Sequence, residues 1–270
     1  MNPNWLGTAC AVVALMAFYG SHRIAAGWSS RRRALLSTVS TLLSIPGASF
    51  AVHYLHVVPE TSGYFEFRSW RGTEALLVLL GFAGGAIATL VPRRYLVAPL
   101  LGTSVLAFSP VLKPFVRPIP SDTLVDRWVG AVCLQSTAST CGPASVATVL
   151  KQHRVDVAER ELAREAHSYL GGTEAWYLAR CIRKRGCEAR FYMSSGWDDA
   201  IPLPAVAGVR IDSAGHFIAL LSREGDRIRV GDPLHGPEEL TRDELTRRYT
   251  FTGFFMGISR PRGRTTASPD

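Results

Sequence analysis

The sequence is short of charge. Only 19% of its 270 residues are Asp, Glu, Lys or Arg, while 47% are hydrophobic, which excludes an ordinary soluble domain for the whole chain. Internal repeats and low-complexity tracts are absent. After residue 113 there is also no apolar run of the roughly 18 residues that a membrane-spanning helix needs. Because the chain as a whole is so apolar, this uneven distribution predicts a membrane region followed by a globular region.

Four apolar runs in the first part of the chain are expected to span a membrane. They are Trp5 to Gly20, Leu35 to Val58, Ala75 to Val91 and Tyr95 to Leu112. The link between the first two runs and the link between the last two are rich in arginine, and such basic loops stay in the cytoplasm. The remaining loop, 59–74, offsets its arginines with glutamate. Four spans in this order place both chain ends outside the cytoplasm, and the absence of Lys or Arg from residues 1–5 disfavours a cleaved signal peptide.

The globular region lacks several common functional motifs. No Cys or His pair has zinc-ligand spacing, and no G-x-x-x-x-G-K-[ST] phosphate loop occurs, so we expect no metal, no cofactor and no ATPase. The net charge of +8 permits nucleic-acid binding, but six positive charges lie in the two arginine-rich loops, and no aromatic–basic platform is present. The runs VAERELAREA and ELTRDELTRR interleave both signs, as in a solvated helix face. We therefore expect no nucleic-acid partner.

Cys141 stands where a reactive thiol is expected. The segment that follows, GPASVATVLKQH, carries Val146, Val149 and Leu150 on one helical face, and Pro143 suits the first turn of a helix. At the N-terminus of that helix, unpaired N–H groups and the positive end of the helix dipole stabilise a thiolate. An isolated cysteine is more often buried and inert. Cys141 is therefore interpreted as a nucleophile only if partner residues accompany it.

Three further residues supply such partners. His216 precedes the apolar run Phe217 to Leu221, and Asp232 ends the strand-like segment DRIRVGD, so a hairpin through SREGD brings both to the same end. Gln135 lies on a Ser/Thr-rich loop from which its amide can donate to an oxyanion, with the backbone N–H of Cys141 as a second donor. A base and an orienting carboxylate complete what acyl transfer needs. Each residue alone has an ordinary alternative, such as a half-buried histidine or a turn aspartate, but the four rarely occur in this order by chance.

Four segments together resemble a known family. They are CLQSTASTCGPASVATVL, GGTEAWYLARCIRKRGCEARFY, GHFIALL and VGDPLHG. They are similar to the papain-like cysteine peptidases that process bacteriocin and peptide-pheromone leaders, the double-glycine leader peptidase family. The resemblance covers Asp126 to Ile258 and implies an α+β fold, with a nucleophile helix packed on an antiparallel sheet. It also implies that Cys141 is the nucleophile, His216 the base, Asp232 the orienting acid and Gln135 the oxyanion donor.

The chain also departs from that family. Its best-known members are N-terminal domains of ATP-driven exporters, whereas here the expected spans precede the peptidase and the phosphate loop is lacking. A double-glycine leader is therefore not assigned as the substrate. What the resemblance implies is a membrane-anchored, stand-alone relative.

The expected organisation is an all-α transmembrane region over 1–115 with about four helices, a linker over 116–125, a papain-like cysteine peptidase domain over 126–258 and a disordered tail over 259–270. We expect a multi-pass protein of a bacterial inner membrane, with an extracytoplasmic peptidase that cleaves a peptide or protein, an exported one if this orientation holds. Two alternatives stay open: a catalytically silent peptide-binding module of the same fold, and an acyltransferase or amidase that forms the same thioester. The pairing of Cys181 with Cys187 is also left open.

Overall fold

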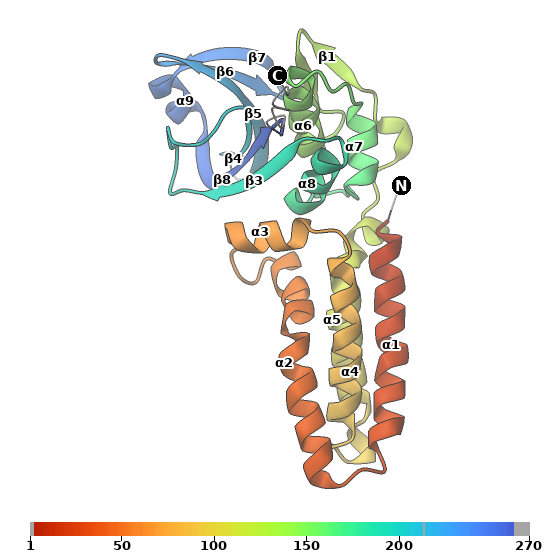
Figure 1. The fold of residues 1–270 in the computed structure, drawn as a ribbon. Helices are drawn as coiled ribbons and strands as arrows, with labels where there is room; N and C mark the ends of the chain where they lie inside the picture. Colours follow the sequence, from red (N-terminus) through yellow and green to blue (C-terminus); the bar gives the residue numbers. More distant parts are fainter. Residues whose placement is uncertain (1–2, 213, 262–270) are drawn as a thin grey trace, which may run out of the picture. The chain divides into compact units, whose positions relative to one another are not determined.

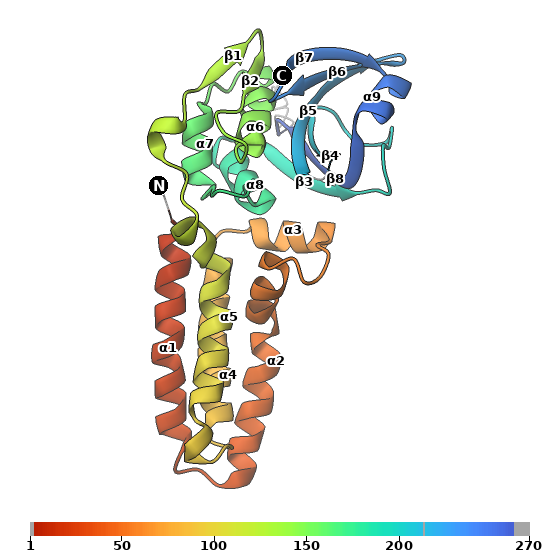
Figure 2. The same ribbon diagram turned by 180° about the vertical axis from the view of Figure 1, so that it is seen from behind.

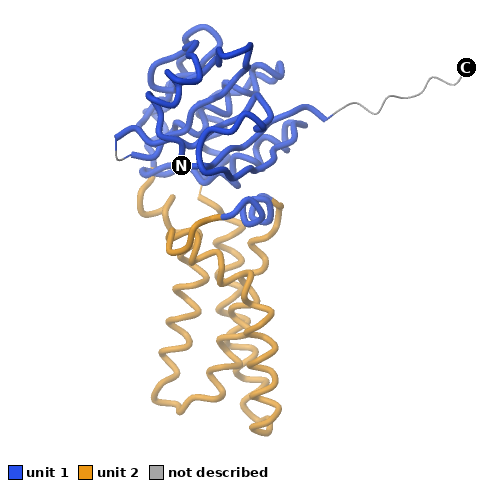
Figure 3. The backbone as a smooth tube through the Cα atoms, turned by 90° about the vertical axis from the view of Figure 1, so that its left-hand side faces the viewer, with its two compact units in different colours: residues 1, 61–69, 119–270 blue, residues 2–60, 70–118 orange. Residues whose placement is uncertain are grey.

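The computed structural model describes residues 3–212 and 214–261, which form two compact units. One unit comprises Thr61–Ser69 together with the chain from Ile119 onward. The other comprises the described chain up to Glu60 together with Trp70–Pro118 (Figure 3). Most of the expected disordered tail, residues 262–270, lies outside the described residues.

The helical unit is a bundle of α1 (Trp5–Ala25), α2 (Ser30–Tyr54), α4 (Leu77–Ala88) and α5 (Val97–Val116) (Figure 1). Two 3₁₀ helices, η1 (Thr73–Leu76) and η2 (Arg93–Tyr95), precede α4 and α5. Glycines of α4 allow its neighbours to approach closely. A Cβ on Gly81 would lie 1.8 Å from the carbonyl oxygen of Ala14, and one on Gly84 would lie 1.9 Å from Thr103 Oγ1. Close contacts at small residues are typical of helices packed in a membrane.

By length and composition, three helices of the described chain could cross a membrane. They are Trp5–Ala25, Ser30–Tyr54 and Arg93–Val116. A fourth is added if Ser62–Ser69 and Thr73–Ala88, bent by 100°, count as one span. Large apolar side chains point away from the bundle, among them Met16 at 66% exposure and Leu35 at 65%, and such an outward apolar surface is what contact with lipid requires.

The globular unit is built on a six-stranded antiparallel sheet with the strand order β3-β8-β4-β5-β6-β7. The strands are β3 (Glu188–Met193), β4 (Ala205–Ile211), β5 (Ala214–Glu224), β6 (Arg227–Asp232), β7 (Gly236–Thr241) and β8 (Thr250–Ser259). A separate antiparallel pair consists of β1 (Arg127–Val129) and β2 (Val132–Leu134). A short 3₁₀ helix, η3 (Ser121–Thr123), precedes this pair.

Helices cover the sheet from two sides. The helices α6 (Cys141–Gln152), α7 (Glu159–Glu165) and α8 (Ala175–Lys184) lie on one side, and α9 (Arg242–Arg248) lies on the other (Figures 1 and 2). Every residue of α6 from Cys141 to Leu150 is buried. The α+β class expected from the sequence, with a helix packed on an antiparallel sheet, is therefore confirmed.

A second core lies on the α9 side of the sheet. It contains alternate residues of β5 and β6, namely Ile218, Leu220, Ile228 and Val230, together with Leu245 and Tyr249. Because side chains alternate between the two faces of a strand, His216 and Asp232 lie on this same face.

The loop 59–74, expected from its sequence to be a polar connection between two spans, has a structure of its own. It contains α3 (Ser62–Ser69), which belongs to the globular unit. The ring of Phe65 stacks on Phe191 with centroids 5.1 Å apart. Glu66 pairs with Arg183 at 2.6 Å and accepts a hydrogen bond from the backbone N–H of Phe191 at 3.2 Å. So short a helix is stabilised by this packing and not by its own propensity.

The packing of α3 leads to a prediction about stability. The ring of Phe65 also contacts Phe254, with centroids 5.0 Å apart, and Trp176 at 6.1 Å. We expect Phe65→Ala to destabilise the globular unit by about 3 kcal/mol, as a truncated core phenylalanine does elsewhere. Urea unfolding of the full chain in detergent, followed by tryptophan fluorescence, measures this. The control is Phe82→Ala, because Phe82 is 46% exposed. Equal free energies of unfolding for the two variants would contradict the prediction.

Candidate active site

His216 and Asp232 meet at the end of the β5–β6 hairpin. The expected hairpin is present, and Ala219 pairs with Gly231 in its ladder, which makes His216 and Asp232 close neighbours on one face. The imidazole Nε2 lies 3.0 Å from Asp232 Oδ1. His216 is 7% exposed and Asp232 is fully buried, so this contact is shielded from solvent.

The electrostatics of this pair follow from burial and hydrogen bonding. Burial alone would lower the pKa of His216, but its hydrogen bonds with Asp232 and Cys141 raise that pKa to about 9. Burial would raise the pKa of Asp232, yet hydrogen bonds with His216, Tyr249 and the backbone N–H of Leu234 hold that pKa below its ordinary value. Both shifts favour an imidazolium beside an ionised carboxylate.

Cys141 opens α6 and its side chain contacts His216. Because Nε2 of the imidazole faces Asp232, Nδ1 is the nitrogen left for the thiol. One turn further along α6, the Ser145 hydroxyl donates to the backbone oxygen of Phe217 at 3.0 Å. This bond ties the helix that carries the thiol to the strand that carries the imidazole.

Gln135 lies on the loop between β2 and α6. Its backbone N–H donates to the carbonyl oxygen of Pro233 at 2.9 Å, directly after Asp232. Its side-chain Nε2 donates to the carbonyl oxygen of Thr137 at 2.8 Å. An amide nitrogen has two N–H groups, so this bond leaves the second N–H of Gln135 Nε2 available for another acceptor. The backbone N–H of Cys141 belongs to the first turn of α6 and has no acceptor within the helix.

Two residues that hold this arrangement were missed in the sequence. Glu159 was assigned to a solvated helix face, but it is fully buried. Its carboxylate accepts hydrogen bonds from the Ser136 backbone N–H at 2.8 Å and from the Ser136 hydroxyl, which anchors the residue after Gln135. The hydroxyl of Tyr249, a residue that follows the second mixed-charge run, donates to Asp232 Oδ2 at 2.7 Å. The burial of Glu159 could not be predicted from the mixed-charge pattern, because neighbours such as Arg160 are exposed, as expected for a solvated helix face.

The other cysteines of the globular unit are buried and free. They are Cys133, Cys181 and Cys187. Burial raises the pKa of the Cys181 thiol to about 12, so this thiol is unreactive at neutral pH.

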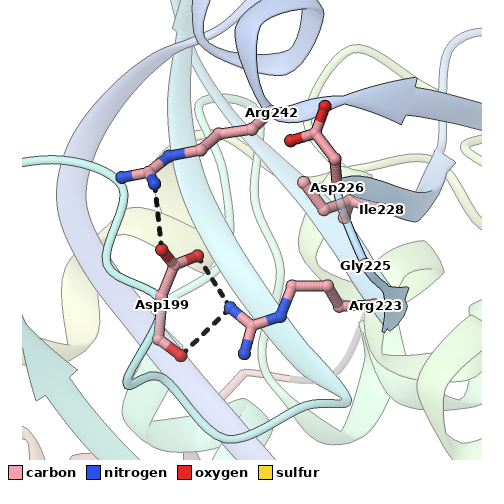
Figure 4. Close-up of a pocket in the computed structure, with 6 residues that line it drawn as sticks. All are labelled: Asp199, Arg223, Gly225, Asp226, Ile228 and Arg242. Atoms are coloured by element: carbon pink, nitrogen blue, oxygen red, sulfur yellow. Dashed lines mark hydrogen bonds and ion pairs between the residues drawn. The ribbon is translucent and has the colours of Figure 1, made fainter.

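A surface cleft of about 320 Å³ lies elsewhere on the globular unit (Figure 4). Its two guanidinium groups, those of Arg223 and Arg242, both pair with Asp199, at 2.7 and 3.1 Å. None of the four expected site residues lines this cleft. Among the residues that the structure describes, no group of three or more His, Cys, Asp and Glu is placed to hold a metal ion.

An antiparallel sheet with a helix packed on it, and a cysteine at the start of that helix beside a histidine of the sheet, defines the papain-like cysteine peptidase fold. Residues 131–260 match the Peptidase C39 family. The chain belongs to this family, as the resemblance in the sequence predicted.

Relatives match the chain over about half its length. An uncharacterized protein of Methanothermobacter marburgensis is 31% identical over 126 residues, which cover 47% of this chain and 86% of that protein. The probable functional amyloid protease FapD of Pseudomonas fluorescens is 31% identical over 134 residues, or 46% of this chain and 59% of FapD. The lactococcin-G-processing and transport ATP-binding protein LagD of Lactococcus lactis subsp. lactis is 25% identical over 123 residues, only 18% of LagD and 44% of this chain.

A solved structure is also similar to this chain. It is a double glycine motif protease from an AMS/PCAT transporter, in complex with the leader peptide. Its sequence identity is 21% and its TM-score 0.41, with 51% of this chain and 94% of that chain covered.

The His216–Asp232 contact gives a testable pH dependence. In Asp232→Asn the negative charge that raises the pKa of His216 is lost while burial, which lowers it, remains. We therefore expect the titration midpoint of His216 to fall from about 9 toward the ordinary value of 6.5. Proton and carbon NMR of histidine-labelled full chain in nanodiscs measures the midpoint, and the other histidines serve as internal controls. An unchanged midpoint would show that Asp232 does not stabilise the imidazolium.

Proposed function

We propose that this chain is a membrane-anchored cysteine peptidase that cleaves a peptide or protein through a thioester intermediate. Cys141 is the nucleophile, His216 the acid and base, Asp232 the group that orients the imidazole, and Gln135 an oxyanion donor. One observation carries the proposal: the buried imidazole of His216 lies 3.0 Å from the carboxylate of Asp232 and is hydrogen-bonded to the thiol of Cys141. This is the arrangement that generates a nucleophilic thiolate.

The chemistry follows from these positions. The Cys141 thiolate attacks the carbonyl carbon of the scissile bond, and the resulting oxyanion accepts hydrogen bonds from the Gln135 amide and the Cys141 backbone N–H. The His216 imidazolium gives its proton to the leaving amine, so the C–N bond breaks and a thioester remains on Sγ. Neutral His216 then takes a proton from water, which attacks the thioester. Release of the carboxylic acid product restores the thiolate and the imidazolium.

Two features support an extracytoplasmic peptidase. The arginine-rich links around residues 21–34 and 93–94 favour the cytoplasm. In addition, α3 packs within the globular unit, so α3 and the chain after Ile119 must lie on the same side of the membrane. This requires an even number of crossings between them, which α4 and α5 supply if both span. A chain with α5 as its only crossing after α3 would separate two parts that are in contact.

The relatives' names support a polypeptide substrate. LagD is named for processing and transport of lactococcin G, and FapD as a protease of functional amyloid. With the orientation proposed here, this chain would meet exported proteins. The peptidase domain would extend over 126–258, with α3 as an added helix and 116–125 as the link to the membrane region.

The cleavage activity predicts new protein N-termini in cells. We expect cells that express the wild-type chain to contain exported proteins with N-termini that are absent when Cys141→Ser replaces it, because an alcohol is a far weaker nucleophile than a thiolate. Mass spectrometry of chemically labelled N-termini compares the two. Cys187→Ser, at a buried thiol outside the site, is the matched control. Identical N-termini in all strains would favour the silent binding module, and an acyl group added to an intact protein would favour the transferase.

The orientation predicts the activity of alkaline phosphatase fusions. We expect activity from fusions placed after Asp270 and after Glu60, and none from a fusion after Arg33, because the enzyme is active only outside the cytoplasm and basic loops stay inside. Activity from the Arg33 fusion alone would show that the orientation is the reverse of the one proposed. Activity from the Glu60 fusion without the Asp270 fusion would point to an odd number of crossings after α3.

A further inference from the structure

The carboxylate of Asp232 is held by three donors although it is wholly removed from solvent. His216 Nε2 at 3.0 Å and the backbone N–H of Leu234 at 2.8 Å both face Oδ1. The Tyr249 hydroxyl, at 2.7 Å, faces Oδ2. A buried ionised carboxylate is costly unless its lone pairs are satisfied. In the described chain, Tyr249 is thus the side chain that satisfies the oxygen turned away from the imidazole.

The surroundings of Tyr249 determine where its hydroxyl proton points. Nε of Arg248 lies 3.2 Å from the Tyr249 oxygen, and the same guanidinium pairs with Glu238 at 2.7 Å. A guanidinium only donates hydrogen bonds, so the hydroxyl accepts from Arg248 and its own proton goes to Asp232. Burial and the nearby Asp232 raise the pKa of Tyr249, which keeps the phenol protonated and able to donate.

Packing holds the ring of Tyr249 in place, so its hydroxyl cannot move away from Asp232. Tyr249 is 2% exposed and packs in the core cluster with Leu245 and Phe255. Its position at the junction of α9 and β8 therefore fixes the hydroxyl opposite the end of β6. The charged and titratable groups that face it are Asp232 of β6, Glu238 of β7 and Arg248 of α9.

We propose that Tyr249 is a positioning residue, which fixes the Asp232 carboxylate in the ionised form and orientation that stabilise the His216 imidazolium, with Arg248 orienting the Tyr249 hydroxyl. This inference rests on the function proposed above and adds a fourth side chain to the group that activates Cys141. Its action is indirect, because Tyr249 touches Asp232 and not the thiol. A purely structural role of the ring would survive its replacement by phenylalanine.

The test is the pH dependence of Cys141 alkylation by iodoacetamide. It uses the full chain in lipid nanodiscs, with peptide mapping to separate Cys141 from the other four cysteines. In the wild type we expect the alkylation rate to reach a plateau at acidic pH, where the thiolate–imidazolium pair reacts. The rate should rise a second time as His216 loses its proton near pH 9. For Tyr249→Phe we expect the plateau rate to fall about tenfold, as the loss of a hydrogen bond to a charged group predicts, and the second rise to move to lower pH.

Two further variants keep the test specific. Tyr192→Phe removes a hydroxyl from a ring packed against the same core cluster, and its profile should coincide with that of the wild type. Arg248→Gln should shift the second rise in the same direction as Tyr249→Phe, by a smaller amount. The Arg248 side chain is 41% exposed, so we expect this variant to fold even if Tyr249→Phe does not.

The outcomes separate this inference from the proposed function. If Tyr249→Phe and Arg248→Gln both match the wild type while Asp232→Asn does not, the positioning role is overturned and the peptidase proposal stands. If Tyr249→Phe does not fold, an unchanged Arg248→Gln profile overturns the inference by itself. If the pH profile of Cys141 alkylation stays unchanged in both Asp232→Asn and His216→Ala, the proposed function is overturned as well.

Discussion

The contact between His216 and Asp232 is the interaction around which the candidate active site is built. Both side chains are almost completely buried, and a buried charge persists only where its partner and its hydrogen bonds are in place. The β5–β6 hairpin sets the distance between the two side chains, and the turn after Asp232 adds the backbone N–H of Leu234. The fold around the pair is therefore arranged to keep a carboxylate and an imidazolium together out of water.

Helix α6 positions the thiol of Cys141 next to this pair. The Ser145 hydroxyl binds the backbone of Phe217 on β5, and the Thr148 hydroxyl accepts the backbone N–H of Cys133 on β2. The helix also packs tightly on β6, because a Cβ on Gly231 would lie 3.0 Å from the Thr148 side chain. These contacts set the start of α6, and with it the side chain of Cys141, beside the imidazole of His216.

Local signals in the sequence predicted part of this arrangement. Pro143 after Cys141 indicated a helix start, and the turn at Gly225 indicated the hairpin that brings His216 near Asp232; both elements are confirmed. The positions of Glu159 and Tyr249 depend on contacts between distant segments, and no local pattern marks them. The packing of Phe65 on Phe191 joins residues 126 positions apart across two expected spans, so the sequence pattern of a polar loop could not reveal it. The roles of Cys141, His216, Asp232 and Gln135 in catalysis stay predictions.

Of the five cysteines, we expect Cys141 alone to be activated by the imidazolium of His216. The most direct measurement is covalent labelling of the full chain in nanodiscs with a peptidyl epoxide at neutral pH, with the modified residue identified by mass spectrometry. We expect a single label on Cys141 of the wild type, lost in His216→Ala, because the epoxide needs both a thiolate and a proton donor. Equal labelling of Cys141 in the wild type and in His216→Ala, or a label on Cys133 in its place, would contradict it.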